Sequence, residues 1–126
     1  MKDNNFQIVV PFYNDKDSFE TFVEILNKME TEDNAFILLD NGSDTNEIKK
    51  IAENKRKNNW TFVHSEKNLG FGGGIKYAAE FVEKEFVAWM PGNLKLNPSD
   101  VYEVIAKQNL DEKYLYIKCA RKNRPK

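Results

Sequence analysis

The chain has 126 residues, enough for one domain, and its 19 basic and 20 acidic residues leave a formal net charge of −1. This balance argues against a nucleic-acid-binding protein, which would carry a basic surplus on one face. The single cysteine, Cys119, excludes an internal disulfide and a cysteine-based zinc site. No apolar run approaches the roughly 18 residues of a membrane span, and the N-terminus is not a signal peptide. We therefore expect a soluble, cytoplasmic chain, although a longer parent protein could be membrane-associated.

Short apolar runs alternate along the chain with stretches of helical periodicity. Each apolar run is uninterrupted, which is typical of strands that are covered on both faces. The predicted strands are residues 6–10, 36–39, 60–63, 86–90 and 114–119. Trp60 and Trp89, which lie in the third and fourth of these runs, are expected to be core aromatics.

The first two predicted helices are preceded by possible capping residues. Apolar residues recur three and four positions apart over residues 19–29 and again over residues 48–52. Asp17 and Glu20 have the spacing of a capping box before the first stripe, and Asp44 and Glu47 repeat that spacing before the second.

The last two predicted helices follow the third and fourth strands. Small residues over 75–82 would let one helix lie close to a sheet. Asn97 and Pro98 are an N-cap and first-turn pair, and they predict a helix with Val101, Val104 and Ile105 facing inward.

The alternation of strands and helices predicts the fold class. It is that of an α/β protein with an open, mainly parallel sheet and helices on both faces, here a single domain over residues 1–126. In such folds ligands bind beyond the carboxyl ends of the strands. The segments to consider are therefore 11–15, 40–44, 68–74 and 91–93.

The first two segments carry polar side chains next to helix starts. Asn14 and Asp15 could cap the first helix or receive a polar ligand, and the two alternatives stay open. Asp40 is not needed as a cap, because Ser43 and Asp44 lie nearer the next helix. That position favours a ligand role, in which its carboxylate accepts hydrogen bonds from a nucleobase or a ribose.

The third segment is rich in glycine and leads into a helix. Four glycines within residues 70–74 would let the backbone approach a phosphate or a sugar, and the helix N-terminus adds partial positive charge. The dinucleotide fingerprint fails because Ile75 stands at its last glycine, and no P-loop is present. The segment could equally be a flexible loop. His64, at the end of the third strand, is assigned no role, since a lone histidine there is more often packed or solvated.

Together these segments resemble family 2 glycosyltransferases. Residues 9–14 (VVPFYN) resemble the opening of that family, and residues 38–44 (LLDNGSD) resemble its second-strand segment. Residues 68–70 (NLG), with the small-residue helix after them, resemble the third. Residues 86–98 (FVAWMPGNLKLNP) fall where the family has its Asp-x-Asp motif, in a version similar to the dolichol-phosphate mannose synthase-like branch.

The resemblance implies a Rossmann-like, GT-A nucleotide-binding half. Its ligand would be a UDP- or GDP-linked sugar, bound with Mg²⁺ or Mn²⁺ for transfer to a glycan, lipid or polyprenyl-phosphate acceptor. Carried over by position, the nucleotide-binding residues would be Pro11, Tyr13, Asp15, Asp40, Asn68 and Gly70. The sugar-phosphate residues would be Gly72, Gly73, Gly92 and Asn93, and Asn93 would also be the remaining metal ligand.

The chain departs from the family pattern at three places. Pro91 and Asn93 replace both carboxylates of the Asp-x-Asp motif, which should weaken the metal site unless Lys95 supplies the positive charge instead. Asn41 replaces the usual second aspartate. The family's acceptor site and general base lie after the fifth strand, and no candidate base follows Cys119. We therefore expect donor binding without turnover, in a trimmed domain or in a short non-catalytic protein.

Two alternatives remain open. The first is a non-catalytic, degenerate GT-A module used for assembly or regulation, in which a homo-oligomer covers the surface that normally meets the acceptor half. The second is a flavodoxin-like receiver or cofactor domain. That domain would have an acidic pair at the end of the first strand, where this chain has Pro11.

Overall fold

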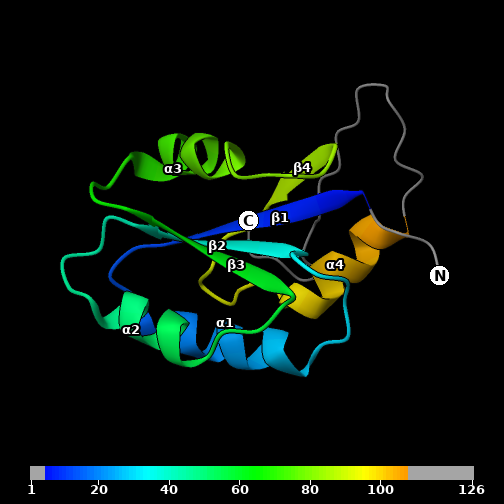
Figure 1. The fold of residues 1–126 in the computed structure, drawn as a ribbon, viewed down its shortest axis with the longest axis horizontal. Helices are drawn as coiled ribbons and strands as arrows, with labels where there is room; N and C mark the ends of the chain where they lie inside the picture. Colours follow the sequence, from blue (N-terminus) through cyan, green and yellow to red (C-terminus); the bar gives the residue numbers. More distant parts are fainter. Residues whose placement is uncertain (1–4, 108–126) are drawn as a thin grey trace, which may run out of the picture.

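The computed structural model describes residues 5–107 of the chain (Figure 1). The elements in order are β1 (Phe6–Phe12), α1 (Lys16–Lys28), β2 (Phe36–Asn41), α2 (Glu47–Asn54), β3 (Trp60–Ser65), α3 (Gly70–Ala79), β4 (Phe86–Trp89) and α4 (Pro98–Ala106). The fifth predicted strand, at 114–119, lies outside the described residues.

The four strands form one open sheet in the order β3-β2-β1-β4, and every neighbouring pair is parallel. Helices α1, α2 and α4 cover one face of this sheet, and α3 covers the other (Figure 1). The predicted α/β fold with helices on both faces is therefore confirmed. Because all four strands run the same way, their carboxyl ends meet at one edge.

Two apolar clusters lie on the two faces of the sheet. Alternate residues of β1, from Phe6 to Phe12, point into the larger cluster with α1, α2 and α4. Edge-to-face ring contacts hold this cluster together, such as Phe12 on Phe19 with centroids 5.0 Å apart. Val9 points into the smaller cluster, where Ala78 of α3 is fully buried. The small residues of α3 thus allow close contact with the sheet, as predicted.

Strand β4 lies at the edge of the sheet in the described part of the chain. It pairs with β1, whereas α3 contacts β1 and β2 on that face. As a result Val87 and Trp89 project from β4 without cover, and Trp89 is 52% exposed. The expectation that Trp89 is a core aromatic is wrong, because it assumed cover on both faces of every strand. Trp60, which is 2% exposed, does lie in the core.

Strand β1 continues through Pro11, past the predicted end at residue 10. The Ile8 N–H donates to the carbonyl of Ala35, just before β2, and the Val9 carbonyl accepts from Met90 on the β4 side. By this alternation the missing N–H of Pro11 falls on the β4 side, beyond the end of β4 at Trp89. Proline is tolerated there because no ladder hydrogen bond is lost.

Helix α1 begins two residues earlier than the capping-box spacing predicts. Its N-cap is Asp15, whose carboxylate accepts the Ser18 N–H at 3.1 Å. Asp17 therefore lies inside the first turn, where its negative charge favours the helix N-terminus. The predicted box of Asp17 and Glu20 is wrong, because the chain enters the helix directly after the loop that follows β1.

The starts of α2 and α4 differ in their capping. Helix α2 begins after Asn46 with no side-chain cap, so the predicted box at Asp44 is also wrong. Helix α4 starts as predicted, since the Asn97 side chain accepts the Ser99 N–H at 2.8 Å. Val104 of α4 is exposed, although the sequence placed it inward. None of the helices in residues 5–107 has the length and apolar character needed to cross a membrane.

Candidate functional site

Asn14 joins the loop after β1 to the loop after β2. Its backbone N–H donates to the Ser43 hydroxyl at 2.9 Å. Its side-chain NH₂ donates to the Asp44 carboxylate at 2.9 Å, while its side-chain oxygen accepts the Asp44 N–H at 2.8 Å. Asp44 is used here rather than as a helix cap. The sequence did not predict this pairing. It depends on the left-handed backbone conformation of Asn14, which has a φ of 52°, and no pattern in the sequence indicates that conformation.

The other residues of the first segment are placed by β1 and α1. Pro11 is a half-buried part of β1, and Tyr13 is an exposed aromatic beyond the strand end. Asp15 caps α1 through its Oδ1 oxygen. Of the two roles expected for it, helix cap or ligand contact, at least this oxygen has the first. Nucleotide contacts by these three residues stay a prediction.

Asp40 is fully buried at the carboxyl end of β2. One carboxylate oxygen, Oδ1, accepts the Ser43 N–H at 3.2 Å, and the other, Oδ2, lies 3.1 Å from Nδ1 of His64. The strand register places His64 directly opposite Asp40. Both oxygens therefore have partners within the chain, and direct contact with a nucleotide stays a prediction.

Asn41 fixes the start of α3. Its side-chain oxygen accepts the Leu69 N–H at 3.0 Å, and its NH₂ donates to the Gly70 carbonyl at 2.9 Å. Both halves of the amide are used in a position that is 4% exposed. An aspartate could accept the first bond but could not donate the second. This explains why an asparagine stands where the family resemblance suggests an aspartate.

Two glycines allow these segments to pack closely. Gly42 has a φ of +72°, as expected for a tight turn, and a Cβ there would lie 2.1 Å from the Lys67 carbonyl carbon. A Cβ on Gly74 would lie 2.7 Å from Nδ2 of Asn41. The loop after β2 and the first turns of α3 therefore form one closely packed unit.

The glycine-rich segment is the first part of α3 rather than a flexible loop. Gly70 begins the helix, and its N–H donates to the Asn68 side-chain oxygen at 2.8 Å. Gly73 packs near Leu69, whereas a Cβ on Gly70 or Gly72 would meet nothing within 4 Å. Gly70 and Gly72 therefore leave open space beside an exposed helix start. The N-cap residue of this helix, Leu69, makes no side-chain capping hydrogen bond.

The segment after β4 contains Gly92 and Asn93, which have different surroundings. Gly92 is buried against Phe12, and a Cβ would lie 2.3 Å from Cε2 of that ring. Asn93 is exposed, and its side-chain oxygen accepts the Lys95 N–H at 3.1 Å. The described residues contain no group of three His, Cys, Asp or Glu side chains placed to hold a metal ion. One neutral oxygen with a backbone partner does not fit a divalent cation site.

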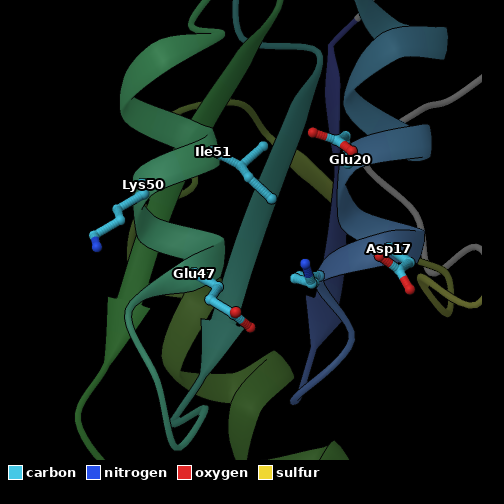
Figure 2. A pocket seen from close by; sticks show the side chains of 6 residues that line it. Asp17, Glu20, Glu47, Lys50 and Ile51 are labelled. Atoms are coloured by element: carbon cyan, nitrogen blue, oxygen red, sulfur yellow. The ribbon is translucent and has the colours of Figure 1, made fainter.

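A hollow between α1 and α2 lies beside the first two of these segments, since its lining begins with Lys16, directly after residues 11–15 (Figure 2). Its lining has three carboxylates, two lysines and Ile51, all from helix surfaces. None of these residues was predicted as a site residue. We therefore regard the hollow as a groove between two helices, and place the candidate site at the carboxyl edge of the sheet.

The comparisons with known proteins bear on these same segments. The chain matches the family model described as Glycosyl transferase family 2 over residues 7–124. That range includes all four strand-end segments. Neither the curated proteins nor the solved structures yield a match to the chain.

Proposed function

The chain belongs to glycosyl transferase family 2, and on this premise we propose that it binds a nucleotide-sugar donor at the carboxyl edge of its sheet. Enzymes of this family take their sugar from a nucleotide sugar in general. The proposal concerns which residues of this chain would hold that donor, and whether these residues could also carry out the transfer.

The start of α3 is the observation that carries the proposal. Gly70 and Gly72 leave open space on an exposed helix start, and although the φ of +74° at Gly70 favours glycine there, neither a contact nor a positive φ requires it at Gly72. The first turn of a helix has N–H groups without backbone partners and a partial positive charge. The Leu69 and Gly70 N–H groups already donate to Asn41 and Asn68, so a diphosphate approaching this backbone would accept hydrogen bonds from the N–H groups that follow them. Asn41 keeps this helix start at a fixed place relative to β2.

The nucleoside would lie between this helix start and the loops after β1 and β2. Tyr13 offers an exposed ring for stacking against a base, and it is 45% exposed. The bonds from Asn14 to Ser43 and Asp44 hold the two loops together as one wall. We propose Pro11, Tyr13, Asp15, Asp40 and Asn68 as the residues nearest the nucleoside, with UDP and GDP as the candidate nucleotides.

The sugar-phosphate would lie between the first turn of α3 and the loop after β4. Asn93 and Lys95 are exposed in that loop and can reach polar groups of a donor. Because the residues at 91–93 do not fit a protein-held divalent cation, the helix start and Lys95 would supply most of the positive charge. We therefore expect nucleotide binding to depend only weakly on Mg²⁺ or Mn²⁺.

Each carboxylate of the segments 11–15 and 40–44 already has a partner within the chain, which argues against these residues as the base that deprotonates an acceptor. Asp15 caps α1, Asp40 is buried with two partners, and Asp44 is bonded to Asn14. An inverting transfer needs a base within hydrogen-bond reach of the attacking hydroxyl. We propose that residues 5–107 bind the donor, and that transfer to a glycan, lipid or polyprenyl-phosphate acceptor needs groups beyond them.

Calorimetric titration of Gly72→Asp with UDP and GDP tests this proposal. The new carboxylate would fit the open space at the helix start, where a negative charge is favourable to the helix. It would repel a diphosphate, so we expect a fold of unchanged stability and a loss of nucleotide affinity of at least about tenfold.

The matched control is Asn58→Asp, which adds the same charge at an exposed position before β3, at the opposite edge of the sheet. It should bind nucleotide as the unaltered chain does. Equal affinities for the two variants would contradict the proposed diphosphate site. Failure of the unaltered chain to bind either nucleotide would favour a non-catalytic module instead.

A further inference from the structure

His64 presents the accessible end of a buried pair. Its side chain is 33% exposed, whereas the side chain of its partner Asp40 is 0% exposed. The two lie opposite each other on β3 and β2, at the edge where the donor is proposed to bind. A ligand approaching this point would therefore meet the imidazole ring before it could reach the carboxylate.

The pair fixes which ring nitrogen of His64 faces outward as an acceptor. A carboxylate can only accept hydrogen bonds, so Nδ1, at 3.1 Å from Oδ2 of Asp40, carries the proton. In the neutral ring the other nitrogen, Nε2, is then an acceptor. Among the described residues Tyr77 bonds to the His64 carbonyl and none bonds to Nε2.

We propose that His64 contacts the nucleoside through Nε2, and that Asp40 is the positioning residue that sets its tautomer. Nε2 would accept a base N–H or a ribose O–H of the nucleotide. This inference rests on the proposed function and refines it, because the residue in contact with the nucleoside is His64 rather than the buried Asp40. It also gives the site a way to select bases.

The selectivity follows from base chemistry. Uracil and guanine present an N–H at ring positions N3 and N1, whereas cytosine and adenine present a lone pair at the same positions. An outward acceptor pairs with the first two bases and repels the second two. If the ribose is the donor instead, a 2′-deoxynucleotide should bind less tightly and the base should matter little.

Asp40→Asn is the variant that reverses this arrangement without changing its shape. The Ser43 N–H would hold the amide oxygen at the Oδ1 position, so the NH₂ group would face Nδ1 of His64. Nδ1 must then accept, and the proton moves to Nε2. His64→Asn is the complementary variant, because its amide can still donate to Asp40 but leaves nothing at the place of Nε2.

The tautomer can be measured without any ligand. His64 is the only histidine of the chain, so ¹⁵N-histidine labelling gives NMR signals from one ring. We expect the Nδ1–H tautomer for the neutral ring in the unaltered chain and the Nε2–H tautomer in Asp40→Asn. An Nε2–H tautomer in the unaltered chain would overturn the inference, whatever the protein binds.

Calorimetric titrations then test the contact between His64 and the nucleoside. The affinities to compare are those for UDP and CDP and for GDP and ADP, and 2′-deoxy-UDP and 2′-deoxy-GDP test the role of the ribose. The unaltered chain should prefer one nucleotide by about tenfold over its lone-pair counterpart or over its deoxy form. Asp40→Asn should lose or reverse that preference, and His64→Asn should lose it while keeping its thermal stability.

If the unaltered chain binds nucleotide and His64→Asn binds it equally well, this inference is wrong and the proposed function stands. If the unaltered chain binds none of these nucleotides, the proposed function itself fails. The two failures are therefore distinguishable in one set of titrations.

Discussion

Replacing Asn41 by aspartate should destabilise the protein, although it brings the sequence closer to the family pattern. The Asn41 side chain is almost fully buried and bonds to both Leu69 and Gly70. Asn41→Asp keeps an acceptor for the Leu69 N–H. It loses the donor to the Gly70 carbonyl, and places a carboxylate oxygen about where the NH₂ group lies, 2.9 Å from that carbonyl oxygen.

The magnitude follows from three effects. Loss of the hydrogen bond costs about 1 kcal/mol, and a buried carboxylate oxygen facing a carbonyl oxygen without a donor adds about 1–3 kcal/mol. A negative charge near the α3 N-terminus stabilises the protein by about 0.3–1 kcal/mol, which offsets part of this loss. The net loss is therefore about 1–4 kcal/mol, which lowers the thermal midpoint of a domain of this size by roughly 5–20 °C.

Urea unfolding followed by circular dichroism measures this loss, with Asn68→Asp as the matched control. Asn68 lies in the same loop and is exposed, and its side-chain oxygen accepts the Gly70 N–H at 2.8 Å. The same substitution there keeps the acceptor and gains from the same helix start, so its stability should change by less than about 0.5 kcal/mol. Equal stabilities of the two variants would refute the role assigned to the Asn41 amide.

Three further predictions concern the packing and capping of the fold. Gly92→Ala should cost about 1–3 kcal/mol in urea unfolding, because its Cβ would overlap the Phe12 ring; unchanged stability would contradict that contact. Asp15→Ala should cost about 1 kcal/mol in the same assay through loss of the α1 cap, and Asp15→Asn should restore most of it. Trp89→Phe leaves the buried Trp60 as the fluorophore, so acrylamide quenching should fall strongly; equal quenching before and after would place Trp89 under cover.

The sequence was sufficient to predict the order of the described elements and which segments meet at the carboxyl edge of the sheet. Those predictions depend on local patterns: apolar runs for strands, period-3.6 stripes for helices, and pairs such as Asn97 and Pro98 at a helix start. The strand ends are adjacent to helix starts in the chain itself. Parallel strands then bring all of these segments to one edge.

The contacts within the site could not be predicted in the same way. Asn14 with Asp44, Asp40 with His64, and the tie from residue 41 to the start of α3 each join residues 24 to 30 positions apart. Which side chains meet depends on strand register, and no local pattern specifies it. Trp89 was misplaced for a related reason, since the apolar run of β4 does not show that the strand lies at an edge of the sheet within residues 5–107.

Calorimetric titration of the unaltered chain with UDP and with GDP, each with and without Mn²⁺, is the first test of a donor site in this chain. We expect one of the two nucleotides to bind, with an affinity that Mn²⁺ changes little, because residues 91–93 provide no carboxylate for a metal ion. Absence of binding under all four conditions would contradict a donor site at the carboxyl edge of the sheet.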